Sequence, residues 1–137
     1  MITFTIYGRP QPKQRPRVLR SGITYTPKET LNYEEQVKQA AIQSELLPEK
    51  PTEEALKIII WCFFEIPKSW PKKKQEQARR GQIYPTARHN GDIDNLAKIV
   101  MDGLNGVAYK DDSQIVQLVI NKQYSEEPRV EVLIDRI

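Results

Sequence analysis

Cysteine and histidine are almost absent from this chain of 137 residues, which contains one of each. A single cysteine excludes an internal disulfide framework, and one cysteine with one histidine argues against a zinc enzyme. The chain also lacks a long hydrophobic run: its most apolar stretch, ALKIIIWCFFEIP, is too short and too interrupted to span a bilayer. The opening MITFTIYGRPQP has no secretory-signal pattern. We therefore expect a cytoplasmic protein.

The composition is that of an ordinary globular protein, with 39% hydrophobic and 28% charged residues. A chain of this length buries a core without disulfide or metal staples. It contains no internal repeat, low-complexity tract or Pro/Gly-rich linker. We therefore expect residues 1–137 to form one domain.

The charges are distributed unevenly around a formal net charge of +3. Residues 9–20 hold five basic residues and no acid, and residues 68–80 hold six basic residues and one glutamate. Residues 92–112 reverse the sign, with five aspartates and two lysines. A charge run by itself is most often a solvated face. Two basic segments around an acidic centre are also what a metal-dependent enzyme acting on a polyanion requires.

Alternation and turn residues predict the strands. ITFTIYG reads as an opening strand, and RVLRSGITYTP as a hairpin that turns at Ser21-Gly22. ALKIIIWCFFEIP, rich in β-branched and aromatic residues, is expected to be a central strand with Cys62 in the core. SQIVQLVINKQYS and PRVEVLIDRI are the remaining two strands.

Three helices are expected between these strands. The first is capped by Thr26 or Thr30 and runs to about Leu47. The second is a short exposed basic helix in SWPKKKQEQARRG, with Ser69 as its N-cap, followed by a loop in GQIYPTARHNG. The third is DNLAKIVMDGLNG, which ends at Asn105-Gly106. Together these elements predict an α+β fold, a mixed β-sheet packed by two main helices.

The third helix presents a charged stripe. Asp94, Lys98 and Asp102 fall at i, i+4 and i+8 on one face. The opposite face is apolar, which favours packing against a sheet; it consists of Ile93, Leu96, Ile99, Val100 and Leu104. Asp92 precedes the helix, where it either caps the helix or projects from extended backbone beside Asp94.

A purely structural interpretation explains part of this pattern. It makes Asp92 an N-cap, places Asp94 in the first turn where the helix macrodipole favours a carboxylate, and makes Asp94 and Lys98 an ordinary i, i+4 pair. The Lys-Asp-Asp at 110–112 is then a turn. It does not explain why two carboxylate groups flank one helix about 20 Å long. If the chain returns Asp112 beside the helix start, three or four carboxylates converge. Such a cluster needs a cation, and hard oxygen ligands suit Mg²⁺ or Mn²⁺.

A cation there would polarise a phosphodiester and activate a water molecule. Lys98 would either stabilise charge that develops on phosphorus or help to orient the nucleophile. The basic segments would hold the phosphate backbone. The residues alone thus indicate a Mg²⁺-dependent enzyme that acts on nucleic acid.

The segment GDIDNLAKIVMDGLNGVAYKDDSQIV resembles the RusA family of Holliday-junction resolvases, which prophages often encode. The family signature is Asp-x-Asp-Asn-Leu-x-Lys, then an Asp about four residues later and an Asp-Asp pair before a strand. Convincing resemblance covers about the last third of the chain. It implies an α+β homodimer that uses Mg²⁺, with Mn²⁺ as a substitute, to nick four-way DNA junctions in pairs. A two-fold dimer suits a two-fold junction.

The resemblance also assigns residues. Asp92, Asp94 and Asp112 fall on the family's metal-binding carboxylates, and Lys98 falls on its catalytic lysine. Asp111 is a neighbour that assists, and Asp102 matches a recurrent acidic position without an assigned role. The expected DNA contacts are basic residues of the two flanking segments: Arg9, Lys13, Arg15, Arg17, Lys72, Lys73, Lys74 and Arg88. The basic excursion at 68–91 departs from the family pattern, and His89 within it is either a phosphate contact or incidental.

Three other functions stay open at this point. One is a nuclease for other branched DNA, such as flaps or forks, because phosphate contacts carry little information about junction geometry. Another is a DNA-binding protein without catalysis, whose carboxylates are structural. The third, a Ca²⁺-binding module, is weak because the segment lacks the ligand spacing of an EF-hand loop.

Overall fold

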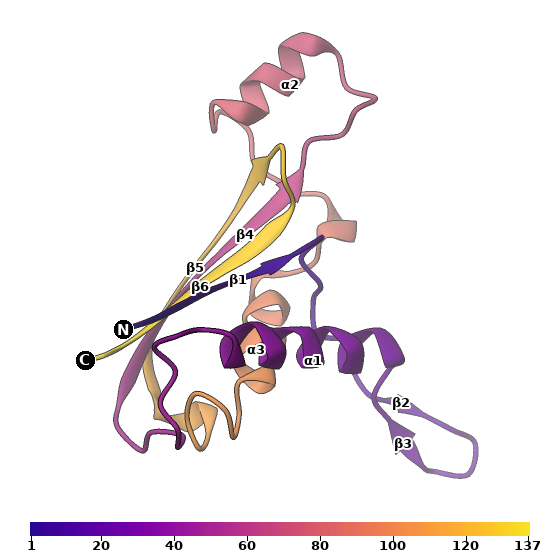
Figure 1. Cartoon of the computed structure of the whole chain (residues 1–137). Coiled ribbons are helices and arrows are strands. Elements are labelled where there is room, and N and C mark those ends of the chain that lie inside the picture. The colour runs from indigo at the N-terminus through magenta and orange to yellow at the C-terminus, as the bar shows by residue number, and fades with distance from the viewer.

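A computed structural model describes all residues 1–137 and shows a mixed α/β arrangement (Figure 1). The strands and helices occur in the following order: β1 (Ile2–Tyr7), β2 (Arg17–Val18), β3 (Thr24–Tyr25), α1 (Lys28–Ile42), β4 (Leu56–Glu65), α2 (Lys72–Arg79), η1 (Arg88–Asn90), α3 (Ile93–Gly103), η2 (Asp112–Gln114), β5 (Ile115–Ser125) and β6 (Arg129–Arg136). The expected α+β fold with a mixed sheet and two packed helices is confirmed. No helix is long and apolar enough to cross a membrane.

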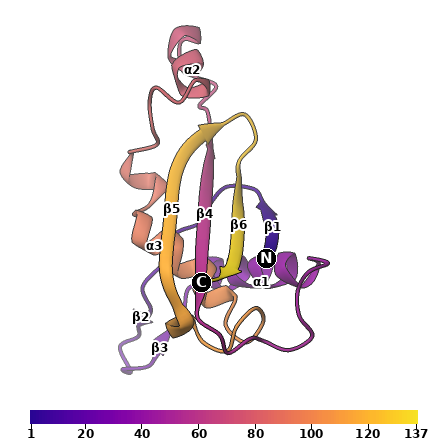
Figure 2. The same ribbon diagram turned by 90° about the vertical axis from the view of Figure 1, so that its left-hand side faces the viewer.

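The main sheet has the strand order β1-β6-β4-β5, which Figure 2 shows face on. β6 pairs antiparallel with both β1 and β4, whereas β4 and β5 are parallel. A parallel pair requires a long crossover connection. The crossover from β4 to β5 contains α2, η1 and α3, so the whole acidic segment lies within it.

The alternation of β4 sends every second residue into the core, as its sequence predicts. Ile58, Ile60, Cys62 and Phe64 are buried there, and the core position expected for Cys62 is confirmed. Burial raises the pKa of the Cys62 thiol to about 12, so the thiol is neutral and inert at neutral pH. Both α1 and α3 lie against this face of the sheet, and the other face is open to solvent (Figure 2).

α3 packs closely on α1 because one residue at their crossing has no side chain. A Cβ on Gly103 would come within 3.0 Å of Val37 Cβ. Leu96, Ile99 and Val100 of α3 are buried in the same core. The predicted apolar face of the helix is therefore confirmed except at Ile93, which is 44% exposed because the first turn of α3 lies over a cavity rather than the core.

The expected helix caps are wrong in two places. α1 begins after Pro27, with no side-chain cap from Thr26, and Thr30 is buried, where its hydroxyl accepts a hydrogen bond from the Gln14 amide. The helix ends at Ile42 rather than near Leu47. α2 likewise begins after Pro71 and has no side-chain cap, so Ser69 does not cap it. In both helices proline, with its fixed φ and no N–H group, starts the helix.

Two basic projections extend from opposite ends of the molecule (Figure 1). α2 stands beyond one end of the sheet, tied back by the Arg79–Glu126 ion pair and by Trp70, whose ring packs edge-on against Tyr124. The hairpin of β2 and β3 projects at the other end and turns at Gly22, whose φ of +86° suits a glycine. The hairpin predicted there is confirmed.

Candidate active site

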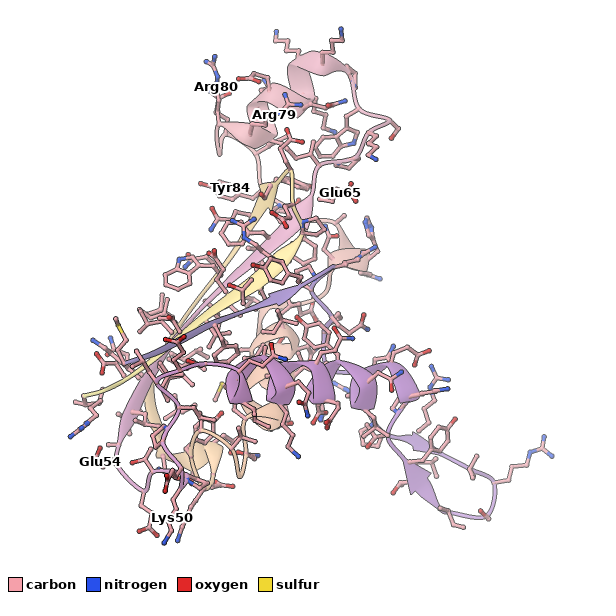
Figure 3. The ribbon with its side chains drawn as sticks, in the orientation of Figure 1. Lys50, Glu54, Glu65, Arg79, Arg80 and Tyr84 are labelled. Atoms are coloured by element: carbon pink, nitrogen blue, oxygen red, sulfur yellow. The ribbon has the colours of Figure 1, made fainter.

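A cavity of about 740 Å³ opens beside the start of α3. One wall is the segment Tyr84–Thr86, the second is Asp92–Asp94, and the third is Ile120–Lys122 of β5. Figure 3 shows Tyr84 near the end of the sheet that carries α2, at the opposite end of the molecule from Lys50 and Glu54. The cavity therefore lies between the base of the projecting basic helix and the acidic segment.

Asp92 and Asp94 face this cavity without protein partners. Asp92 has extended backbone (φ −80°, ψ 146°) and occupies the N-cap position of α3, yet its carboxylate makes no capping hydrogen bond. Asp94 lies in the first turn and is exposed. It does not pair with Lys98, whose ammonium lies 3.4 Å from Asp102 instead. The capping hydrogen bond of Asp92 and the Asp94–Lys98 pair are therefore absent, while the place of Asp94 in the first turn agrees with the structural interpretation. Both carboxylates are free to bind a ligand.

Gly91 fixes the direction in which the chain enters α3. Its φ of +91° is open to glycine, and a Cβ at this position would come within 2.7 Å of Pro12. Its carbonyl accepts a hydrogen bond of 2.8 Å from the Lys122 ammonium. The loop before α3 is thus held by Pro12 on one side and by β5 on the other.

The other end of the charged stripe is neutralised within the protein. The Lys13 ammonium lies 2.5 Å from Glu34 and 3.2 Å from Asp102, and all three side chains are about four-fifths buried. Burial alone lowers the pKa of Lys13, but the hydrogen bonds to Glu34 and Asp102 outweigh it and raise the pKa. The Lys13 amide also donates to the Asn95 carbonyl. Lys13, expected to contact DNA, instead ties the N-terminal loop to α1 and α3.

The chain after α3 turns back and brings Asp112 beside the helix. The Tyr109 hydroxyl donates to the Met101 carbonyl at 2.6 Å, which holds this return loop against α3. Asp111 then forms a capping box with Gln114 around η2. The turn expected for the Lys-Asp-Asp segment is thus built around Asp111, while Asp112 lies on the helix side.

Asp112 contacts Asp102 and not the two carboxylates at the start of α3. Burial and a hydrogen bond with Asp102 raise the pKa of Asp112, and the nearby Lys98 charge opposes this shift. The negative charge of the neighbouring Asp102 disfavours ionisation of Asp112. Asp112 thus lies beside the C-terminal half of α3, whereas the sequence suggested that it would lie beside the start of the helix.

The donor set can be compared with the needs of a divalent cation. No three His, Cys, Asp or Glu side chains converge as a preformed metal cage. Mg²⁺ does not need one, since it usually binds one or two carboxylates and completes its shell with waters and substrate phosphates. Asp92 and Asp94, which are exposed, unpaired and line the same cavity, fit that requirement in charge and in ligand chemistry.

The basic residues lie on either side of this acidic helix. Along the long axis of the molecule, α3 lies between α2 and the β2–β3 hairpin in both views (Figures 1 and 2). The exposed cations are spread over α2, η1 and the chain at β2: Lys72, Lys73, Lys74, Arg88, Arg15 and Arg17. Of these, Lys74 lies 4.0 Å above the Trp70 ring and still reaches solvent.

Arg9 and His89 are placed differently from the other candidates. The Arg9 guanidinium donates to the His89 carbonyl at 3.1 Å, which orders the segment before Asp92. The His89 side chain lines a separate cavity with Trp70 and Tyr124 rather than the one at Asp92. His89 therefore does not contact the acidic site.

Two site residues were missed by sequence reasoning. Glu34 reaches Lys13 from α1, and no local pattern pairs these residues across 21 positions. Lys122 lies in INKQY, where alternation places a lysine on the same face as Ile120 and Tyr124. The signal that could have identified Lys122 is a charged residue at an inward-facing position of a strand.

The cavity lined by Asp92, Asp94 and Lys122 is therefore the candidate active site. A profile of the family described as "Endodeoxyribonuclease RusA" matches residues 7–135. The chain is also 39% identical, over 141 aligned residues, to "Uncharacterized protein YqaN" of Bacillus subtilis (strain 168), in a match that covers 99% of this chain and 96% of that protein. The chain belongs to the RusA family of endodeoxyribonucleases.

Proposed function

We propose that this protein is a Mg²⁺-dependent endonuclease that resolves four-way DNA junctions by paired, symmetric nicks. Family membership supplies the reaction class, hydrolysis of DNA phosphodiesters. The observation that carries the rest is the pair of unpaired carboxylates, Asp92 and Asp94, at a cavity between two basic projections. If these carboxylates were only structural, we would expect them to form capping hydrogen bonds or ion pairs, and they form neither.

Asp92 and Asp94 bind the cation in this proposal, and Asp112 is the third ligand that the family motif implies. These carboxylates would hold a Mg²⁺ ion, or Mn²⁺ in its place, which would supply polarisation of the phosphodiester and activation of an attacking water. Asp112 contacts Asp102 in the structure, so its carboxylate would have to move to join Asp92 and Asp94 around the cation.

Lys98 stabilises the negative charge that develops on the phosphate. Its side chain is 59% exposed and lies one helical turn from Asp94, so its ammonium reaches solvent above the acidic stripe. Asp102 holds one side of the ammonium, which limits its motion without covering it. A positioned cation of this kind contributes most where charge appears in the transition state.

The DNA backbone is held by the exposed cations on both sides of α3: Arg15, Arg17, Lys72, Lys73, Lys74 and Arg88, with Arg9 beside His89. Lys13 is excluded from this set because Glu34 and Asp102 already neutralise it. Contacts of this kind position a duplex and do not read its sequence.

A homodimer is the proposed functional unit. β5 is an edge strand of the main sheet and exposes Val116, Leu118 and Val119. An exposed apolar edge is a ready site for pairing with another chain. A second copy is the partner that a two-fold junction calls for, because paired nicks need two equivalent sites. Light scattering at micromolar concentration tests this, with a Val116→Lys/Val119→Lys variant expected to be monomeric.

The experiment for the function is cleavage of a labelled mobile four-way junction beside a linear duplex of the same sequence, in Mg²⁺ or in EDTA. Metal-dependent, paired, symmetric nicks in the junction alone are the expected result. A 5′-flap and a fork run in parallel, and preference for either one would replace the junction with another branched substrate. Binding without nicking in Mg²⁺ or Mn²⁺ would instead make the protein a non-catalytic DNA binder.

A further inference from the structure

Lys122 is a charged residue on the apolar face of the sheet. In the parallel pairing of β4 and β5, Ile120, Lys122 and Tyr124 lie beside Ile60, Cys62 and Phe64 respectively. Paired residues point to the same face, and these three β4 partners are buried in the core. Placing an ammonium on such a face is unfavourable unless the charge is neutralised or hydrogen-bonded.

The Lys122 ammonium has only a neutral partner in the protein. It donates one hydrogen bond, 2.8 Å long, to the Gly91 carbonyl. None of the ion pairs of the protein involves it, although its side chain is half-buried. An ammonium carries three donors, so two remain, and Lys122 lines the same cavity as Asp92 and Asp94.

The charges that line this cavity are not paired with one another. Its wall holds the Lys122 ammonium, the carboxylates of Asp92 and Asp94, and the polar residues Thr86 and Asn121. A ligand that carries negative charge and also coordinates a cation held by carboxylates would satisfy both groups at once. A phosphodiester is such a ligand, because one oxygen can contact a metal ion while another accepts from an ammonium.

We propose that Lys122 is a second catalytic lysine, which contacts a non-bridging oxygen of the scissile phosphodiester in this cavity. The inference rests on the proposed function and adds the place where the phosphate docks. The hydrogen bond to Gly91 orients the ammonium, and Gly91 itself is held by Pro12. The cation is therefore fixed before DNA arrives, which is the condition for efficient electrostatic stabilisation.

The first test compares Lys122→Met with Lys57→Met and Lys122→Arg. Lys57 is a matched control: it is half-buried, lies on the neighbouring strand β4 and forms no ion pair, but it faces the other side of the sheet. Under single-turnover conditions with saturating junction and Mg²⁺, Lys122→Met should cut about 100- to 1,000-fold more slowly. Lys57→Met should stay within about twofold of wild type and Lys122→Arg should fall in between.

A second measurement separates contact with phosphate from support of the loop. Junctions with a charged or a methylphosphonate linkage at the mapped cleavage position are bound in EDTA by wild type and by Lys122→Met. If Lys122 contacts the phosphate, removing the phosphate charge should weaken junction binding by wild type several-fold and leave binding by Lys122→Met unchanged. The two changes are then coupled in a double-mutant cycle. Equal effects in both proteins would mean that Lys122 only supports Gly91, and would overturn the proposal.

Stability gives an independent check. Methionine suits an apolar sheet face, so Lys122→Met should melt at or above the temperature of wild type. A large loss of thermal stability, together with an additive cycle, would assign Lys122 to the fold instead. If wild type cuts no junction in Mg²⁺ or Mn²⁺, the proposed function fails. If wild type cuts and the cycle is additive, only the role of Lys122 fails.

Discussion

The two ends of α3 carry the same kind of residue in opposite electrostatic states. At the start of the helix, Asp92 and Asp94 are exposed and unpaired beside a cavity. Toward its end, Asp102 is about four-fifths buried and lies within ion-pair distance of Lys13 and Lys98. Carboxylates in one helix can therefore either stabilise the fold through ion pairs or stay unpaired and available to bind a ligand. The number and placement of neighbouring cations decides which.

The difference also explains why a basic protein concentrates its aspartates. Asp102, toward the C-terminal end of α3, pairs with Lys13 of the N-terminal loop and with Lys98 of the helix itself, so these two lysines are internal counter-ions. The start of the helix meets only Lys122, whose ammonium is directed at a backbone carbonyl. The two carboxylates there are exposed and available to a cation.

The largest effect should come from the free carboxylates. Asp92→Asn removes a proposed metal ligand and should reduce single-turnover junction cleavage by about 1,000-fold or more, since metal-ion catalysis contributes several kcal/mol. Asp112→Asn should behave in the same way. Junction binding in EDTA should be unchanged or tighter, because a negative charge near phosphates is removed. Parallel loss of binding and cleavage would argue against a catalytic role.

Mutations in the ion-paired group of Lys13, Glu34 and Asp102 should change the free energy of unfolding. Lys13→Met leaves Glu34 and Asp102 without their shared cation and should lower the free energy of unfolding by about 1–3 kcal/mol. Arg15→Met, in the same basic segment but exposed, should change it by about 0.5 kcal/mol or less. Urea unfolding of both variants provides the comparison, and equal stabilities would remove the proposed role of Lys13.

The pH dependence of the Lys13 effect has a definite sign. Hydrogen bonds in the folded protein raise the pKa of Lys13 above its usual value of 10.5. The stabilisation is therefore present in full at neutral pH and is lost as the pH rises through the raised value. The difference in stability between wild type and Lys13→Met should be constant from about pH 6 to 9 and shrink above pH 10.5.

The basic projections should affect affinity more than rate. Replacing Lys72, Lys73 and Lys74 by glutamine, or Arg15 and Arg17 by glutamine, should weaken junction binding. Every lysine or arginine that touches a phosphate in the wild-type complex should, when replaced, reduce the slope of log affinity against log salt by about 0.9. Titrations at several salt concentrations measure this for each projection. An unchanged slope in one variant would show that its projection does not touch DNA.

The smallest effect separates the adjacent aspartates of the return loop. Asp111 accepts the Ser113 amide in a capping box and is exposed. Asp111→Ala should cause a modest loss of thermal stability and leave the cleavage rate within a few-fold of wild type, in contrast to Asp112→Asn. A loss of cleavage as large as that of Asp112→Asn would move Asp111 into the metal site.

Local periodicity was sufficient for much of the fold. The alternation in β4 and β6 set their buried faces, and the 3.6-residue period of α3 separated its apolar face from the acidic stripe. These features depend on neighbours a few positions apart. The helix starts were misjudged because Pro27 and Pro71 begin the helices without side-chain caps, where Thr26 and Ser69 looked like suitable caps.

The sequence by itself determined the strands, the acidic helix and the motif that places the chain in its family, because each is written in adjacent residues. Only the tertiary structure decided which charges are used. Lys13 pairs with Asp102, Asp112 contacts Asp102, and the Lys122 ammonium donates to the Gly91 carbonyl. Each of these contacts joins residues that are distant in the sequence. The strength of an electrostatic interaction depends on distance and burial, and neither is encoded by spacing along the sequence.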